Sequence, residues 1–286
     1  MLFSTKAIIV KVAFANTATD ALTLLTLRML FSLPFYLVSA LTIARNKNYT
    51  PLNRQQWTGI LVLGLFGYYL SSLFDFVGLQ YVSAGLERLI LFLYPTFAVL
   101  INATVFKQPV TRVQQIALLL TYLGIGIAYI GELHVDTGNA NFYWGSFLIF
   151  LCAITYSSYI AGSGYMVPRT GAARFTSYSM LAATTGIFIH FLIAGNNYHL
   201  LFQKTNLWGY GILLAIVATV IPTFLLAAGM KKIGTNNVAV ISAIGPVSTI
   251  LQAHFVLHEK IFAAQIAGTI LVIIGVLLIG WKKGAS

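Results

Sequence analysis

Long apolar runs separated by short polar connections make up almost the whole chain. Segments such as Ile60–Leu73, Ile212–Gly229 and Ile266–Trp281 contain few polar residues besides Gly, Ser and Thr. A helix needs roughly 20 apolar residues to cross a bilayer, and helices satisfy their own backbone hydrogen bonds in lipid. The runs show no period-two alternation, so the pattern indicates membrane-spanning α-helices rather than strands.

The pattern predicts an all-α integral membrane protein with ten transmembrane helices. We expect these helices at 1–15, 21–44, 57–80, 85–106, 113–131, 143–165, 175–195, 208–229, 236–257 and 263–281. The connections are short and hold most of the Asn, Lys, Arg and Asp residues. No connection is long enough to house a soluble domain.

Composition supports the same class. The chain is 58% hydrophobic and 8% charged, with a mean hydropathy of +0.85, whereas soluble domains carry about 25% charged residues. Its one cysteine, Cys152, lies in an apolar stretch, which excludes an internal disulfide and a cysteine metal site. We expect the partners to be the lipid bilayer and a small-molecule solute, with no cofactor; the sequence sets no oligomeric state.

The net charge is +11, and the positive residues are distributed along the chain as expected for the topology of a membrane protein. One set of alternate connections carries Arg45, Lys47, Arg54, Lys107, Arg112, Arg169, Arg174, Lys231, Lys232, Lys282 and Lys283. The opposite set carries Lys204 and Lys260, with Asp20, Glu132, Asp136 and Glu259. This positive-inside pattern predicts a multi-pass protein of the inner (plasma) membrane with a cytoplasmic C-terminus. No basic face interleaved with aromatic residues is visible, so a nucleic-acid partner is not expected.

An internal repeat predicts the architecture. A shift of 151 residues superimposes Trp57 on Trp208, Gly78 on Gly229, Pro95 on Pro246, Gln114 on Gln265 and Gly124 on Gly275. Five helices per copy is an odd number, so the two copies would be inverted. We expect repeats at 1–131 and 143–283, with a substrate site between them, as in inverted-repeat secondary transporters. Structural duplication without transport is the alternative.

The repeat also makes the first helix look truncated. Met1 aligns with Cys152, in the middle of the expected sixth helix. We therefore expect the first helix to lack roughly two turns at its start. Either a late start codon or a fragment would explain this.

Paired motifs near the two matched prolines are similar to those of a known family. Gly78–Gly85 through Tyr94-Pro95, and Gly229–Asn236 through Gly245-Pro246, resemble helix hairpins that lead to a mid-helix proline. Further similarity lies in Leu257-His258-Glu259-Lys260, which is similar to an "LGE" turn with His in place of Gly, in Thr26-Leu27-Arg28, and more distantly in Phe106-Lys107-Gln108-Pro109. The chain thus resembles EamA-type transporters of the drug/metabolite transporter superfamily. The resemblance implies ten helices in two inverted repeats, a central cavity and alternating access.

Charges inside helices are the best candidates for a site, because each is costly in a membrane unless paired or hydrated. Six fall within the expected helices or at their margins: Lys6, Lys11, Arg28, Asp75, Glu87 and Arg88. We expect Asp75 to meet Arg88 across a short hairpin, while Glu87 points about 100° round its helix. This cluster either pins the hairpin as a structural salt bridge or supplies a protonatable coupling group that pairs alternately with Arg88 or Arg28.

The balance of these charges predicts a substrate class. Lys6 would fall near mid-membrane in a complete first helix, whereas Lys11 can reach an interface. Four positive and two negative charges favour an anionic or zwitterionic solute, with a carboxylate as the simplest example. A poorly solvated carboxylate binds a proton more readily, which would suit proton coupling.

Three prolines and several aromatic residues are further candidates for the functional site. Pro95, Pro222 and Pro246 interrupt helical hydrogen bonding, so they are predicted hinges or cavity linings, or else static kinks. Tyr94 with Tyr68, Tyr69 and Phe92 would form an aromatic wall, or ordinary packing and an interfacial belt.

Other function classes find less support in the sequence. His254 and His258 share a helix face next to Glu259, but no third metal ligand is nearby, so no metal site is expected. No phosphate-binding loop or catalytic triad is present, and the chain is not expected to be an enzyme. The sequence therefore predicts a secondary transporter or exporter of a small metabolite, with a membrane scaffold or receptor as the alternative.

Overall fold

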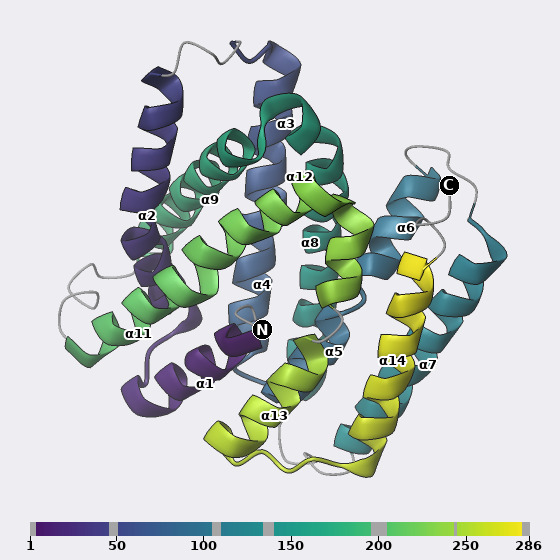
Figure 1. Cartoon of the computed structure of the whole chain (residues 1–286). Coiled ribbons are helices and arrows are strands. Elements are labelled where there is room, and N and C mark those ends of the chain that lie inside the picture. The colour runs from purple at the N-terminus through teal and green to yellow at the C-terminus, as the bar shows by residue number, and fades with distance from the viewer. Residues whose placement is uncertain are drawn as a thin grey trace.

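The structure is a computed structural model that describes residues 4–45, 51–104, 110–133, 140–195, 205–242 and 245–281. Within these ranges all regular secondary structure is helical. The helices are α1 Thr5–Thr17, α2 Ala21–Arg45, α3 Arg54–Gly64, α4 Ser71–Gly78, α5 Ala84–Leu91, α6 Tyr94–Thr104, α7 Arg112–Leu133, α8 Phe142–Thr170, α9 Ala172–Ile193, α11 Thr205–Ala215, α12 Ile221–Ser242, α13 Gly245–Leu257 and α14 Ala263–Trp281. They pack into one bundle (Figure 1).

Polar residues in the connections determine where several helices begin. Asn53 and Gln56 form a reciprocal capping box at the start of α3, which satisfies backbone N–H groups that have no partner in the helix. Thr111 and Gln114 make the same exchange at α7. Ser83 accepts a hydrogen bond from the backbone N–H of Leu86 at the start of α5.

Two spans contain a π-helical segment. Leu65–Leu70 joins α3 to α4, and Ile216–Val220 joins α11 to α12. Single π-helical turns occur often at functional sites. Pro222 lies directly after the second of these segments, inside the continuous span Asn206–Ile233, where its missing N–H removes one helical hydrogen bond.

Pro95 and Pro246 lie in first helical turns, at α6 and α13. The fourth expected helix is interrupted at Phe92 and Leu93, where α5 ends before α6 begins. This agrees with the break expected from Pro95. The hinge role of the three prolines stays a prediction.

The expected hairpin between 229 and 236 was wrong. Helix α12 continues without a break to Ser242, and α13 begins at Gly245. The segment contains Gly229 and Gly234 but no proline, and each glycine costs a helix only about 1 kcal/mol. The side chains of 234–242 and the whole of 243–244 lie outside the described residues.

Helix starts in the two halves are spaced by the same interval as the sequence repeat. Helix α2 begins at Ala21 and α9 at Ala172, α3 at Arg54 and α11 at Thr205, and α7 at Arg112 and α14 at Ala263; each pair is 151 residues apart. Packing corresponds as well. The Trp57 ring of α3 lies 4.9 Å from the Tyr178 ring of α9, and the Trp208 ring of α11 lies 6.0 Å from the Phe31 ring of α2.

Helices α7 and α14 lie side by side at one flank of the bundle, on the right of Figure 1. Glycines allow their backbones to approach closely. A Cβ added at Gly124 would lie 2.6 Å from the Gly268 carbonyl oxygen, and one at Gly275 would lie 2.7 Å from that of Ala117. Small residues are the usual means by which membrane helices pack closely.

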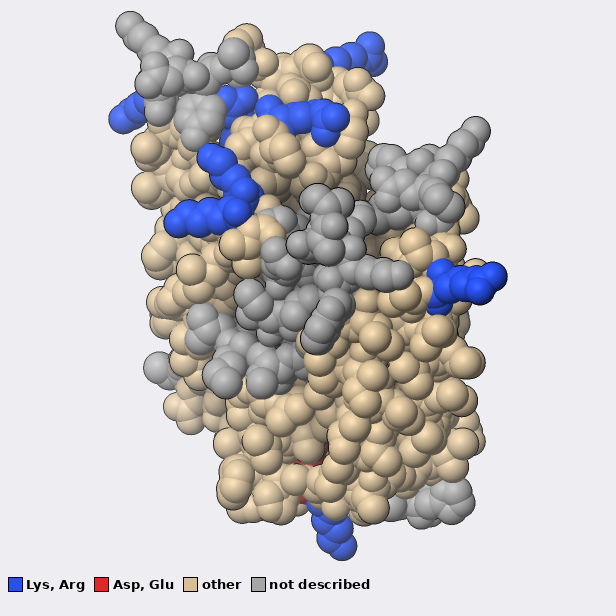
Figure 2. Space-filling model, turned by 45° about the vertical axis from the view of Figure 1, so that its right-hand side comes forward, with Lys and Arg blue, Asp and Glu red and all other residues tan. Residues whose placement is uncertain are grey.

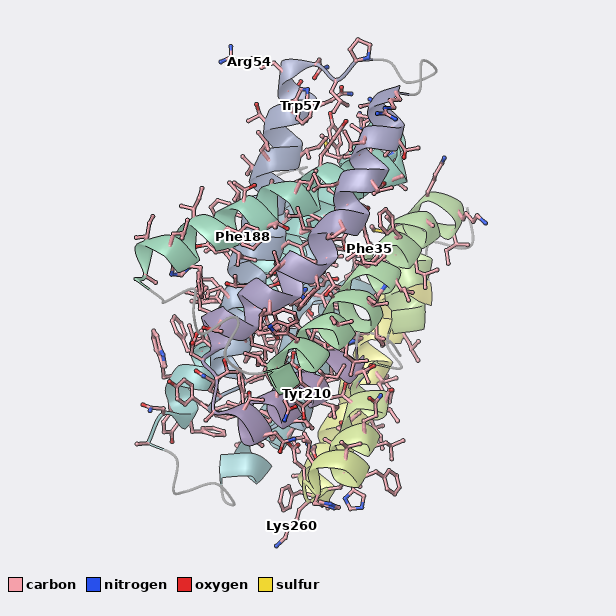
Figure 3. All side chains as sticks on the ribbon, turned by 90° about the vertical axis from the view of Figure 1, so that its left-hand side faces the viewer. Phe35, Arg54, Trp57, Phe188, Tyr210 and Lys260 are labelled. Atoms are coloured by element: carbon pink, nitrogen blue, oxygen red, sulfur yellow. The ribbon has the colours of Figure 1, made fainter. Side chains whose placement is uncertain are left out.

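The exterior is apolar between two polar ends. Seven helical spans of the described residues, some of which run through two labelled helices, are long and apolar enough to cross a membrane, and Ala263–Leu278 is a shorter apolar helix. Figure 2 shows Lys and Arg side chains gathered mainly over one end, with an uncharged surface below them. Figure 3 places Arg54 and Trp57 at that end and Lys260 at the opposite end. Among the basic residues expected in connections, Lys47, Lys107, Lys204, Lys282 and Lys283 lie outside the described residues.

Candidate functional site

Three charged side chains meet inside the bundle. The Lys6 Nζ atom of α1 lies 2.6 Å from Asp75 Oδ2 of α4 and 3.4 Å from Glu87 Oε1 of α5. The Asp75 and Glu87 side chains are 2% and 0% exposed, and that of Lys6 is 13% exposed. One ammonium group therefore serves two buried carboxylates, and we call this group the Lys6 cluster.

The cluster is incompletely paired. Oδ1 of Asp75 and Oε2 of Glu87 are buried and find no hydrogen-bond partner among the described residues. Charges buried in this way are costly unless they are neutralised. Two carboxylates beside one ammonium can gain a proton or a cationic group without losing the Lys6 contact. This is the chemistry that a binding or coupling site requires.

The expected pairing of Asp75 with Arg88 was wrong. Asp75 is paired with Lys6, and none of the ion pairs between described residues involves Arg88. The reason is tertiary: α1 brings Lys6 between α4 and α5, whereas the hairpin spacing considered only these two helices. Glu87 and Arg88 point in different directions from α5, as expected from helix geometry, but it is Glu87 and not Arg88 that joins Asp75 at Lys6.

Arg88 lies instead against the start of α13. A Cβ added at Gly245 would lie 2.6 Å from Nη2 of Arg88, so a larger residue here would displace the guanidinium from its present position. The Arg88 guanidinium carbon lies 5.9 Å from the centre of the Phe92 ring, and its Nε is buried without a hydrogen-bond partner among the described residues. Arg88 thus connects the helix of Glu87 to the other half of the bundle.

Arg28 of α2 joins the two spans that contain π-helical segments. Its Nε donates to the Thr219 hydroxyl at 2.6 Å, and its Nη1 donates to the Ser72 hydroxyl at 3.4 Å. Thr219 lies within the segment Ile216–Val220, and Ser72 lies just after Leu65–Leu70. The guanidinium also lies 5.3 Å from the centre of the Phe76 ring, which belongs to the same helix as Asp75.

Neither Thr219 nor Ser72 was among the residues expected from the sequence. Both are common small polar residues in apolar helices, so composition alone carries no signal for them. A search for hydroxyl groups at the depth of Arg28 would have found them, because a buried guanidinium requires acceptors.

Buried aromatic rings lie beside these charges. Tyr94 packs edge-on against Phe92 at 5.5 Å and against Tyr156 at 5.4 Å. Tyr68 packs edge-on against Tyr159 at 5.0 Å, and its buried hydroxyl has no hydrogen-bond partner among the described residues. These contacts form a ring cluster of α6, α8 and the first π-helical segment.

Tyr69 lies apart from this cluster. Its hydroxyl and Nδ1 of His190 are 3.0 Å apart. The expected aromatic wall therefore divides into two groups, with Tyr69 directed toward α9. Tyr156 and Tyr159 were not among the expected members.

A turn between α13 and α14 contacts the beginning of α5. The Glu259 carboxylate accepts hydrogen bonds from the backbone N–H groups of Ala84 at 3.1 Å and Gly85 at 3.4 Å. The similarity of this turn to an "LGE" motif was the signal that could have assigned it a structural role. Gln265 lies beside the same turn of α5, where a Cβ at Gly85 would collide with its amide.

His254 and His258 contribute to the structure of the turn between α13 and α14. His254 Nδ1 lies 2.9 Å from the Glu259 carbonyl oxygen. His258 has a φ of 56°, in the left-handed region that favours glycine. Among the described residues, no group of three or more His, Cys, Asp or Glu side chains could hold a metal ion.

Comparisons with a family profile and with individual proteins point to one transporter family. The sequence profile of the EamA-like transporter family matches residues 1–130 and 143–281. The uncharacterized transporter YcbK of Bacillus subtilis (strain 168) is 32% identical over 208 residues, which cover 72% of this chain and 66% of that protein. The uncharacterized transporter YyaM of the same organism is 24% identical over 226 residues, which cover 78% of this chain and 73% of that protein. The chain thus spans slightly less than two thirds of the length of the first of these relatives.

An uncharacterized transporter of Archaeoglobus fulgidus is 21% identical over 224 residues, which cover 78% of each chain. A protein of known crystal structure has the same fold, with a TM-score of 0.65, 18% sequence identity, and coverage of 97% of this chain and 92% of that one.

Proposed function

Because this chain belongs to the EamA-like transporter family, we propose that it is a secondary active transporter or exporter of a small metabolite that works by alternating access. The observation that carries this proposal is the Lys6 cluster. Stability alone does not favour such a group, because a buried ion pair is often no better than apolar residues of similar volume. Charged residues kept inside membrane bundles mark substrate and proton pathways.

Two inverted five-helix repeats, residues 1–131 and 143–283, are the architecture that we propose for this mechanism. The shared interval of 151 residues between helix starts supports it, and so does the corresponding packing of Trp57 and Trp208. The Lys6 cluster would then lie where the repeats meet, as substrate sites do in inverted-repeat transporters.

The membrane orientation follows from charge. The end that bears Arg54 would face the cytoplasm, together with the C-terminus, and the end that bears Lys260 would face outward, in the inner (plasma) membrane.

A carboxylate-bearing solute, such as an amino acid, fits the charges around the cluster. Arg88 and Arg28 could receive its carboxylate, while the free oxygens of Asp75 and Glu87 could receive an amino group or a proton. Proton coupling would follow if Glu87 or Asp75 exchanged a proton as its contact with Lys6 was broken and formed again.

A membrane scaffold or receptor is the alternative. It would use the same buried charges to fix the bundle and would move no solute. A solute-dependent shift in stability, abolished by a change in the cluster, separates binding from pure scaffolding.

A melting-temperature screen of the detergent-purified protein tests the proposal, with amino acids, organic acids, purines and polyamines as ligands. A ligand at 100 times its dissociation constant should stabilise the protein by about 2.7 kcal/mol. We expect one solute class to raise the melting temperature of the parent, and Glu87→Gln and Lys6→Met to alter that response. Lys260→Gln, at the exposed end, is the matched control. An unchanged affinity in Lys6→Met would remove Lys6 from the site.

A further inference from the structure

The first turn of α5 is held by a residue from the far end of the chain. Glu259 accepts hydrogen bonds from the backbone N–H groups of Ala84 and Gly85, which have no partners within the helix. A carboxylate at this position also interacts favourably with the positive end of the helix. Helix α5 has only eight residues and bears both Glu87 and Arg88. The group that holds its first turn therefore helps to place the candidate site.

A residue of α14 makes a second contact with the first turn of α5. Gly85 lacks a side chain where the amide of Gln265, at the start of α14, packs against it. Gln265 is buried, whereas Glu259 is only half-buried. The turn itself is fixed by the contact between His254 and the Glu259 carbonyl oxygen. We call the contacts of Glu259 and Gln265 with α5 the clasp.

Beneath the clasp, α5 covers the only cysteine in the chain. Leu86 and Ile90 of α5 pack in one buried cluster with Ile149 and Cys152 of α8, and Cys152 is 3% exposed. Helix α5 also bears Glu87 of the Lys6 cluster. A movement of α5 that uncovers the cluster would therefore uncover this thiol too.

We propose that Glu259 is a positioning residue that holds α5 over the Lys6 cluster and closes the path to it from the end where Lys260 lies. Helix α5 ends at Leu91, and the interruption at Phe92 and Leu93 separates it from α6, which provides a point where the chain would bend in this movement. Both hydrogen bonds of the clasp are accepted by the half-buried Glu259 carboxylate, and water can replace this carboxylate as the acceptor. This inference rests on the proposed alternating-access function, since it assigns one gate of that cycle.

The rate at which a small maleimide labels Cys152 in the purified protein measures this opening. Glu259→Gln keeps the shape of the side chain but removes its charge, and charge-assisted hydrogen bonds are about twice as strong as neutral ones. We expect Cys152 to be labelled roughly tenfold faster in Glu259→Gln, the factor that corresponds to about 1.4 kcal/mol. Lys260→Gln removes a charge from the adjacent, exposed residue and should leave the rate unchanged.

A second variant breaks the same contact from the other side. Ala84→Pro removes the N–H that donates to Glu259 Oε1. Proline is favoured at the first helical position, and Ser83 already has the extended conformation, with φ −66° and ψ 156°, that proline requires of its predecessor. We expect a smaller, several-fold increase in labelling. Glu259→Asp keeps the charge and should recover part of the parent's protection.

A variant on helices that do not belong to the clasp separates the effect of general destabilisation. Gly64→Ala disturbs the contact of α3 with the Ser179 backbone of α9, and at an equal loss of melting temperature it should expose Cys152 more slowly than Glu259→Gln does. Equal labelling of Glu259→Gln and the parent, or of Glu259→Gln and Gly64→Ala, would overturn the proposal. The labelling needs no solute, so failure of the gate assignment is distinct from failure to find a transported solute.

Discussion

Lys6 and Asp75 form a 2.6 Å ion pair between the first helix and the last turns of the span that runs from α3 to α4. Glu87 of α5 approaches the same ammonium group at 3.4 Å. The ammonium group of one lysine on α1 therefore neutralises carboxylates on two other helices. In the proposed transport cycle, these contacts are the ones that a solute or a proton would exchange.

Replacing Lys6 tests the importance of this arrangement for stability. Lys6→Met leaves both carboxylates buried without their cation, and loss of one partner of a buried ion pair typically costs about 3–5 kcal/mol. We expect a large fall in the melting temperature of the detergent-purified protein. Lys6→Met combined with Asp75→Asn should recover part of this loss, because one uncompensated charge is removed. A single variant as stable as the parent would show that Lys6 does not neutralise the cluster.

Arg28 provides a test in a different part of the interior. Thr219→Val removes the acceptor of the 2.6 Å hydrogen bond from Arg28 Nε while it keeps the shape of the side chain. A buried donor left unpaired costs about 1–3 kcal/mol, so the melting temperature should fall. Thr185→Val is the matched control, because that hydroxyl is exposed and donates only to the carbonyl of Leu181 on its own helix. Equal effects of the two substitutions would contradict the role given to Arg28.

His258 is expected to be strained. Its φ of 56° lies in the left-handed region, which costs a residue with a side chain about 1–2 kcal/mol. His258→Gly should therefore raise the free energy of unfolding by about 1 kcal/mol. Ala18, at the end of α1 with a φ of 45°, offers the parallel variant Ala18→Gly. A lower melting temperature in His258→Gly would show that contacts of the imidazole outweigh the backbone cost.

The contact of α7 with α14 can be tested with two glycines of these helices. Gly275→Ala would place a methyl group 2.7 Å from the Ala117 carbonyl oxygen, so the helices must separate and stability should fall. Gly126→Ala meets no atom within 4 Å and should be neutral, or stabilising by up to about 1 kcal/mol, through helix propensity. Thermal unfolding of both variants checks the prediction. A similar change in both would contradict close packing at Gly275.

The sequence was sufficient to predict the helical membrane class and most helix starts. Apolar runs and the polar connections between them are local signals, and local signals determine where helices begin. Pro95 likewise marked the interruption before α6. The family resemblance was confirmed by the profile match over both halves of the chain.

Local sequence signals could not predict the tertiary contacts. Asp75 was assigned to Arg88 because the hairpin makes them neighbours in sequence, whereas the ion pair is made by Lys6, about seventy residues earlier. The turn expected after Gly229 depended on similarity to Gly78, yet α12 continues through it. The similarity to an "LGE" turn marked Glu259 but did not indicate its partner, because the contact with α5 joins residues 175 positions apart.

Solute counterflow in proteoliposomes tests the central claim most directly. Vesicles are loaded with an unlabelled solute that stabilises the protein in the melting screen, and uptake of the same solute in labelled form is followed. The account predicts transient accumulation of label with the parent protein, its loss in Glu87→Gln and its retention in Lys260→Gln. Uptake no greater than in protein-free vesicles, for every solute that stabilises the protein, would contradict transport and favour the scaffold or receptor alternative.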